Sequence, residues 1–297
     1  MKIAVAKYTV GCPADFDAFA ARQRQVLAQA RAAGAGVAVL PEYLSLELAA
    51  TLGAPVFADL HASLAGIQRY REDWLALYRQ LARELDLHVL AGSFLLDTGD
   101  GRYRNRCDWF TPDGRYGWQD KLQLTGFEKA TGVIAPGDTL KVFEADGVRM
   151  AVAICYDSEF PLPVRRQYEA GARVLLVPSC TDTAAGATRV RVGCLARALE
   201  NRMFVAQAVT AGLAQWSPAL DVNTGEAALY APMDVGFPAD GVLAQTAGDQ
   251  LWAVAELDVD ALDASRGRAQ VANDRDWPGQ ARPALRQAVL SNWADHD

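Results

Sequence analysis

The chain of 297 residues lacks the features that mark several large classes of protein. Its three histidines (His61, His88 and His296) do not lie at ligand spacing from a cysteine, so no zinc site or other metal site is expected. It has no run of about 18 apolar residues, which a membrane helix needs, and Lys7 and Tyr8 interrupt the apolar N-terminus where a signal peptide would continue. It has no run of Lys or Arg, and its net charge of −7 argues against nucleic acid as a partner. We therefore expect a cytoplasmic protein with no cofactor and no membrane partner.

Cysteines are few and scattered. Their number is odd and no CxxC pair occurs, so a disulfide framework is not expected. The five positions are Cys12, Cys107, Cys155, Cys180 and Cys194. Taken by position alone, a cysteine that follows an apolar strand is more often a small buried residue than a catalyst.

Strands and helices alternate along the chain, which indicates an α/β fold. Apolar runs with β-branched residues predict strands over 2–10, 37–40, 88–96, 102–110, 115–120, 149–154, 174–179, 203–209 and 251–257. Helical spacing of apolar residues predicts helices over 14–33, 72–86, 161–170 and 188–202. No Pro/Ser-rich linker divides the chain, so 1–297 is predicted to be one domain, with 264–297 a C-terminal arm that packs on something, such as another subunit.

Reactive side chains follow three of these strands. Glu42 ends the segment VLPEY, Lys121 and Glu128 lie in QDKLQLTGFEK, and Cys155 lies in VAICYDSEFP. Ligand crevices in α/β folds form at strand ends, so these side chains are candidates for a common site. Each also has an ordinary interpretation taken singly: a surface or helix-capping acid, a solvated charged segment and a buried cysteine.

Together the three segments resemble the nitrilase (carbon–nitrogen hydrolase) superfamily, which uses a Glu–Lys–Cys triad in this chain order. Glu128 is similar to an additional glutamate found shortly after the lysine, and PSCTDTAAG and RVRVGCLARALEN resemble the strand and helix after the nucleophile. Tyr156 and Asp157 stand where true nitrilases tend to have Trp and Glu, which resembles the amidase or Nit-like branch. The resemblance spans roughly residues 2–260. It implies a four-layer α-β-β-α sandwich of two mixed β-sheets with outer helices, and a homodimer or higher homo-oligomer.

The chemistry of these residue types agrees with the resemblance. A cysteine attacks as its thiolate and needs a base or a positive charge to form it, and no histidine lies in a motif. Glu42 is expected to act as general base and then general acid, and Lys121 to stabilise the thiolate and the oxyanion. By resemblance, the backbone N–H of Tyr156 is a second oxyanion donor, and Glu128 orients Lys121 or helps to position substrate. The expected reaction cleaves the non-peptide carbon–nitrogen bond of a small amide through a thioester on Cys155.

Substrate contacts are expected mainly after the next strand. Ser179, Cys180 and Thr181 are candidates to line the pocket. Arg189 would pair with a substrate carboxylate, unless it is a surface arginine, whereas Glu159 would favour a substrate amine. These two residues indicate opposite substrate charges, and the sequence does not choose between them.

Alternative functions remain open at this point. A nitrile- or carbamoyl-hydrolysing member of the same superfamily would keep the triad. A transferase or esterase would pass the acyl group to an amine or alcohol instead of water, and a non-catalytic binding homologue would keep only the fold. Some hydrolases that the chain resembles carry a fused acetyltransferase domain. That domain is not expected here, because the hydrolase pattern starts at Met1.

Overall fold

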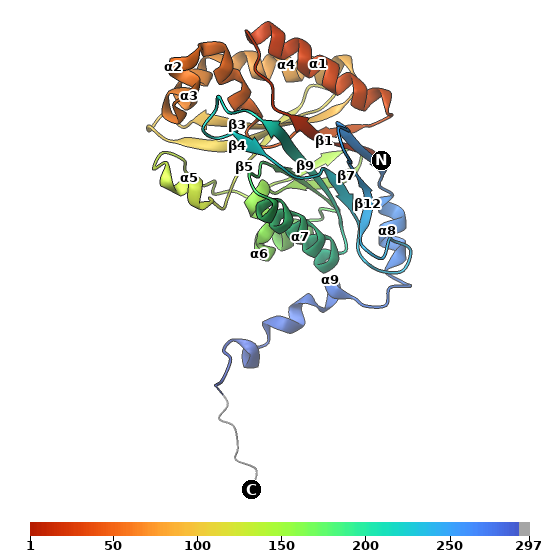
Figure 1. Cartoon of the computed structure of the whole chain (residues 1–297). Coiled ribbons are helices and arrows are strands. Elements are labelled where there is room, and N and C mark those ends of the chain that lie inside the picture. Colours follow the sequence, from red (N-terminus) through yellow and green to blue (C-terminus); the bar gives the residue numbers. More distant parts are fainter. Residues whose placement is uncertain (291–297) are drawn as a thin grey trace.

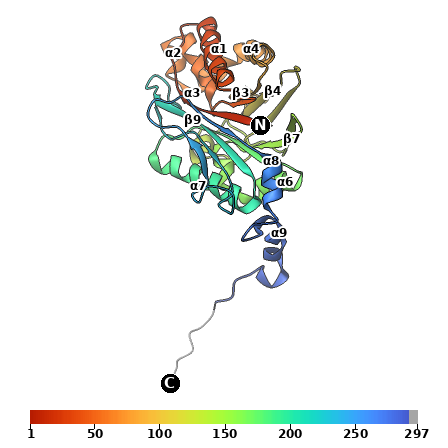
Figure 2. The same cartoon turned by 90° about the vertical axis from the view of Figure 1, so that its right-hand side faces the viewer.

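The computed structural model describes residues 1–290 and contains two half-sheets between outer layers of helices (Figures 1 and 2). The strands of the first half are β5 (Tyr116–Asp120), β4 (Tyr103–Phe110), β3 (His88–Asp97), β2 (Val37–Val39) and β1 (Lys2–Thr9). Those of the second half are β9 (Phe204–Leu213), β8 (Val174–Ser179), β7 (Val148–Val152) and β6 (Val142–Ala145). β1 and β9 pair in parallel near their ends, at Lys7 with Val209, so one hydrogen-bonded path joins both halves.

Both halves mix parallel and antiparallel pairs. β1, β2 and β3 are parallel to one another, and β4 and β5 extend them as antiparallel strands. In the second half β7, β8 and β9 are parallel and β6 is antiparallel. The additional strands pair antiparallel: β13 (Trp252–Glu256) with β1, and β10 (Val222–Asn223), β11 (Ala228–Tyr230) and β12 (Val242–Gln245) at β9 or at each other.

Helices cover the two outer faces. Four helices cover the outer face of the first half-sheet: α1 (Phe16–Ala32), α2 (Ala54–Phe57), α3 (Leu60–Ile67) and α4 (Arg71–Glu84). The second is covered by α6 (Pro161–Glu169) and α7 (Ala184–Asn201) (Figure 1). The predicted four-layer α-β-β-α sandwich is confirmed.

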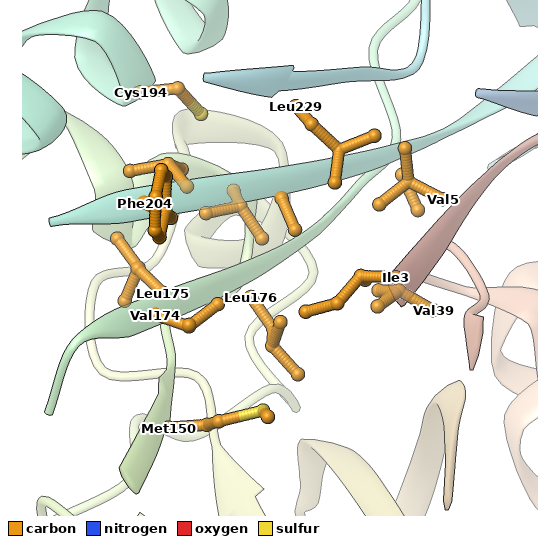
Figure 3. Close-up of a cluster of buried hydrophobic side chains, with 14 of the residues drawn as sticks. Ile3, Val5, Val39, Met150, Val174, Leu175, Leu176, Cys194, Phe204 and Leu229 are labelled. Carbon is orange, nitrogen blue, oxygen red and sulfur yellow. The ribbon is translucent and has the colours of Figure 1, made fainter. Parts of the chain in front are cut away.

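The central strands are buried on both faces, which explains why their sequences are continuous apolar runs. Ile3 and Val5 of β1 belong to the cluster between the half-sheets, whereas Ala4 and Tyr8 point to the layer of α1 and α4. Figure 3 shows Ile3 and Val5 facing the side chains of the second half, such as Leu176. This interlocked core holds the strand ends of both halves in fixed positions.

Several elements differ from the prediction. α7 begins at Ala184 rather than 188, because Thr183 caps it by accepting the N–H of Gly186 at 3.1 Å. The segment between β2 and α4, for which no helix was predicted, forms a 3-10 helix (Leu44–Leu52) followed by α2 and α3. None of the helices in residues 1–290 is long and apolar enough to cross a membrane.

The first part of the C-terminal segment packs on the sandwich, and the later part extends away from it. α8 (Val259–Ser265) and α9 (Asn273–Asp276) stay attached, since Asp274 accepts hydrogen bonds from Arg266 at 2.8 Å and from Tyr168 of α6 at 2.7 Å. Beyond α9 the chain extends away from the two half-sheets (Figure 2). The last part of the predicted arm, 291–297, lies outside the described residues.

Candidate active site

Cys155 leaves the second half-sheet at a strained turn. β7 ends at Val152, and Cys155 opens a 3-10 helix (Cys155–Glu159) with φ of +49°. A left-handed conformation is uncommon for a residue other than glycine and costs about 1–3 kcal/mol, so it persists where the surroundings impose it. Tyr43, directly after Glu42, is also left-handed with φ of +62°. Two of the three predicted segments therefore turn sharply where their reactive side chain stands.

Asp157 connects the cysteine turn to the lysine segment. Its buried carboxylate accepts the backbone N–H groups of Ile154 at 3.1 Å, Leu122 at 3.1 Å and Gln123 at 2.6 Å. Burial raises the pKa of Asp157 to about 7, against the opposing effect of these donors. One side chain thus holds the residues that flank Cys155 and Lys121 in a common frame.

Lys121 is enclosed by two carboxylates. Its Nζ lies 2.8 Å from Glu42 Oε1 and 2.8 Å from Glu128 Oε2, and all three side chains are buried. Burial alone would lower the pKa of the ammonium, but Glu42 and Glu128 outweigh it and raise the pKa of Lys121 above its usual range. Lys121 is therefore a fixed positive charge at the bottom of the site.

Glu42 receives donors on both carboxylate oxygens. Asn105 Nδ2 donates to Oε1 at 2.8 Å and the backbone N–H of Cys180 donates to Oε2 at 3.0 Å. Burial, the largest effect, raises the pKa of Glu42, Lys121 lowers it, and the neighbouring charge of Glu128 raises it further. Glu42 lines the same pocket as the Cys155 thiol, and a carboxylate whose proton affinity is increased by burial is suited to accept a thiol proton.

The Cys155 thiol lines the same pocket as Glu42 and Lys121. It is 4% exposed, and its Sγ lies 3.6 Å from the carbonyl oxygen of Cys180. Burial raises the pKa of Cys155 well above its usual range, and Glu42 adds to this while Lys121 opposes it. The resting form is thus the thiol, and attack requires transfer of its proton to a base.

Glu128 stands behind Lys121. Thr125 caps α5 (Gly126–Ala130), and the Glu128 carboxylate in turn accepts the N–H of Thr125 at 2.9 Å and the hydroxyl of Tyr43 at 2.7 Å. Burial would raise the pKa of Glu128, but Lys121 outweighs it and lowers the pKa. Glu128 does not line the pocket, so its position fits orientation of Lys121 rather than contact with a substrate.

A pocket of about 340 Å³ opens above these groups. Tyr156, Glu159, Cys180, Thr181 and Arg189 line it together with Glu42, Lys121 and Cys155; the other lining residues are Tyr43, Thr125, Phe127, Asp182, Gly186, Val190, Pro218, Ala219, Asp221 and Val222. The N–H of Tyr156 is in the first turn of the 3-10 helix, where N–H groups have no acceptor within the helix. The space suits a small molecule beside the thiol.

Two predicted contacts differ from expectation. Ser179 lies outside the pocket lining: it is the last residue of β8, its side chain is fully buried, and its Oγ donates to the carbonyl of Val177 at 3.3 Å. Glu159 and Arg189, which indicated opposite substrate charges, pair with each other, with Oε1 3.7 Å from Nε. Their charges therefore offset one another at the pocket wall.

Three residues of the site were not predicted: Tyr43, Asn105 and Asp157. Tyr43 and Asp157 lie inside the motifs, next to the residues that were chosen. Asn105 carried no signal, because it reaches the site through the antiparallel pairing of β4 with β5, and its carbonyl accepts the N–H of Lys121 at 2.8 Å. Its Nδ2 also lies 3.3 Å from Glu128 Oε1, so Asn105 joins both carboxylates.

A second depression, of about 510 Å³, lies beside β1 and β10, and Cys155 is not among its lining residues. Its lysine, Lys7, already donates to Glu226 at 2.6 Å and to the carbonyl of Gly248 at 2.9 Å. No cysteine lines it, so the pocket that contains Cys155 is the candidate active site.

Comparisons with known proteins identify the family of the chain. Residues 2–233 match the family model described as carbon–nitrogen hydrolase. The probable hydrolase YhcX of Bacillus subtilis (strain 168) is 28% identical over 280 residues, which cover 93% of this chain and 53% of YhcX. The chain thus spans about half the length of that curated relative. Omega-amidase NIT2 of Xenopus tropicalis is 24% identical over 262 residues, covering 86% of this chain and 88% of that protein.

Solved structures show the same fold. Nit3 of Saccharomyces cerevisiae, a member of branch 10 of the nitrilase superfamily, aligns with a TM-score of 0.73 at 19% identity, covering 93% of this chain and 96% of that one. The triad segments at residues 42, 121 and 155 all fall within the span of the family match.

Proposed function

The chain belongs to the carbon–nitrogen hydrolase family, and we propose that it hydrolyses the carbon–nitrogen bond of a small amide through a thioester on Cys155. The observation that carries the proposal is the meeting of a buried thiol, a carboxylate and an ammonium group at the bottom of one pocket of about 340 Å³. The name of the similar omega-amidase supports an amide as the substrate.

The first half of the reaction acylates the enzyme. Glu42 accepts the thiol proton of Cys155 as the sulfur attacks the amide carbonyl carbon. Lys121 and the N–H of Tyr156 stabilise the negative oxygen of the tetrahedral intermediate. Glu42 then gives the proton to the leaving nitrogen, the carbon–nitrogen bond breaks, and a thioester on Cys155 remains.

The second half releases the acid. Water enters the place of the departed amine, Glu42 accepts its proton, and the oxygen attacks the thioester carbonyl. Collapse of the second tetrahedral intermediate breaks the carbon–sulfur bond, and the sulfur recovers the proton from Glu42. Throughout both halves Glu128 holds Lys121 in place and maintains its charge.

Related reactions use the same groups. A nitrile or a carbamoyl compound would also give a covalent adduct on Cys155. An amine or alcohol that intercepts the thioester would make the protein a transferase. Product analysis with added hydroxylamine shows whether the thioester accepts a nucleophile other than water, because a hydroxamate then forms. A binding homologue without catalysis would release no ammonia from any amide.

The pH dependence of ammonia release tests the role of Glu42. Since Glu42 must be ionised to accept the thiol proton, kcat/KM falls as the pH drops through its pKa. Burial raises that pKa, so the acid limb should lie above the range of an ordinary glutamate, about 4.3. Glu128→Gln removes a negative charge that also raises the pKa of Glu42, and we expect the acid limb to move to lower pH.

The matched control is Glu144→Gln, on the exposed surface of β6. It should leave the pH–rate profile of a small amide unchanged. An acid limb that stays in place or moves to higher pH in Glu128→Gln would remove Glu42 from the role of general base.

We also propose that the protein is a cytoplasmic homodimer or higher homo-oligomer, as the family resemblance implies. Leu162 of α6 and Val192 of α7 support this, because they are apolar yet 62% and 57% exposed on one outer layer. Val289 and Leu290 in the extended arm are also exposed. A second copy would cover these side chains.

Light scattering at micromolar concentration measures this directly. We expect at least twice the chain mass of 32.0 kDa for the wild type. The double variant Leu162→Glu, Val192→Glu should shift the mass towards 32.0 kDa. A wild-type mass of one chain would exclude the homo-oligomer.

A further inference from the structure

The charged groups that line the pocket do not balance. Glu159 and Arg189 pair across 3.7 Å, and Lys121 pairs with Glu42. Arg189 and Lys121 are the two cationic side chains that line the pocket, and each of them already faces a carboxylate.

Two lining carboxylates have no such partner. Within residues 1–290, no nitrogen of Lys, Arg or His lies within 4.0 Å of the carboxylate of Asp182 or Asp221. At the bottom of the site, Glu42 and Glu128 together exceed the single charge of Lys121. The pocket therefore carries a net negative charge that no side chain of the lining neutralises.

The unpaired carboxylates belong to one wall. Asp182 follows Thr181 in the turn between β8 and α7, and Asp221 directly precedes β10. The two segments are joined, because Thr224 donates its N–H to the Thr181 carbonyl at 2.8 Å and Thr181 Oγ1 donates to the Thr224 carbonyl at 2.7 Å. Both residues thus lie on joined segments of the pocket lining, and both are exposed to solvent.

Opposite charge in a partly enclosed pocket attracts a ligand and selects against like charge. We propose that the substrate is an amide whose acyl chain carries an ammonium group, held at the wall formed by Asp182 and Asp221. This rests on the proposed function, because it assigns the charge of the molecule that acylates Cys155. An amide with a carboxylate in the same position would meet two negative groups, and the charge of Arg189 is already offset by Glu159.

The two carboxylates should contribute unequally. Asp182 directly precedes Thr183, the N-cap of α7, whose N-terminus carries a partial positive charge that offsets part of the Asp182 charge. Asp221 has no helix end behind it. We therefore expect Asp221 to contribute more to selection of the ammonium group.

The test compares three matched amides: 5-aminopentanamide (cationic), pentanamide (neutral) and glutaramate (anionic), with four- and six-carbon analogues of each to cover the reach of the pocket. The readout is the ratio of kcat/KM between cationic and neutral members, measured within one variant so that general losses cancel. Each surface carboxylate is expected to contribute up to roughly fivefold to this ratio. Higher ionic strength should reduce the preference.

Asp221→Asn should lower the ratio most and Asp182→Asn less. Asp73→Asn, on the exposed face of α4, is the matched control and should leave the ratio unchanged. Equal turnover of the three amides, a preference for glutaramate, or an unchanged ratio in both variants would overturn the charge assignment alone. If none of the amides were cleaved and no acyl group appeared on Cys155, the proposed function would fail and this assignment with it.

Discussion

Replacing Cys155 by serine or alanine is expected to lower amide turnover by about 10⁴-fold or more, because removal of a nucleophile leaves only binding and oxyanion stabilisation. The Cys155 thiol lines the pocket together with Glu42 and Lys121, and both of these residues influence its pKa. Serine keeps nearly the same shape at the left-handed turn, so its loss of activity would reflect chemistry rather than folding.

Cys12→Ser is the matched control, since Cys12 is an exposed thiol outside the pocket. It should leave kcat and KM unchanged. The contrary result would be a Cys155→Ser variant whose turnover stays within tenfold of the wild type on the same amide. It would show that another group attacks the carbonyl.

Lys121→Met is expected to have the second largest effect, and on two quantities. Loss of an oxyanion donor lowers kcat by about 10²–10³-fold. Loss of the cation also leaves Glu42 and Glu128 as two buried carboxylates without their shared partner, which lowers the free energy of unfolding by about 3–5 kcal/mol. The measurements are kcat at saturating amide and thermal or denaturant unfolding.

A second variant separates the two effects. Adding Glu128→Gln to Lys121→Met removes one of the unpaired carboxylates, so part of the lost stability should return while kcat stays low. Lys129→Met is the control, because Lys129 is exposed on α5, and both quantities should stay at wild-type values. Recovery of kcat in the double variant would mean that Lys121 acts through stability alone.

The sequence was sufficient for the parts of the fold that depend on local pattern. Continuous apolar runs such as 174–179 and 203–209 predict strands, because a strand buried on both faces needs no polar alternation. The 3-10 segment Leu44–Leu52 was missed, since its short elements do not repeat with a helical period. The start of α7 was placed too late, because the small residues after Thr183 resemble a turn.

The candidate site shows the same division. Glu42, Lys121 and Cys155 follow strands, which made them candidates for a common site, and the resemblance to the nitrilase superfamily joined them as a triad. Asn105 depends on the register of β4 against β5, which the sequence does not contain. The ion pair of Glu159 with Arg189 depends on how the 3-10 helix of Cys155 packs against α7. The sequence does not show this packing, so the two residues indicated opposite substrate charges.

The central claim is that Cys155 carries the acyl group of an amide, and intact-mass spectrometry after rapid acid quench tests it most directly. During turnover of a small amide, we expect the wild-type chain to gain the mass of the acyl group, with fragmentation locating it on Cys155. The Cys155→Ser variant should gain no acyl group under the same quench. Ammonia release without any acylated enzyme, or an acyl group on a different residue, would contradict the thioester mechanism.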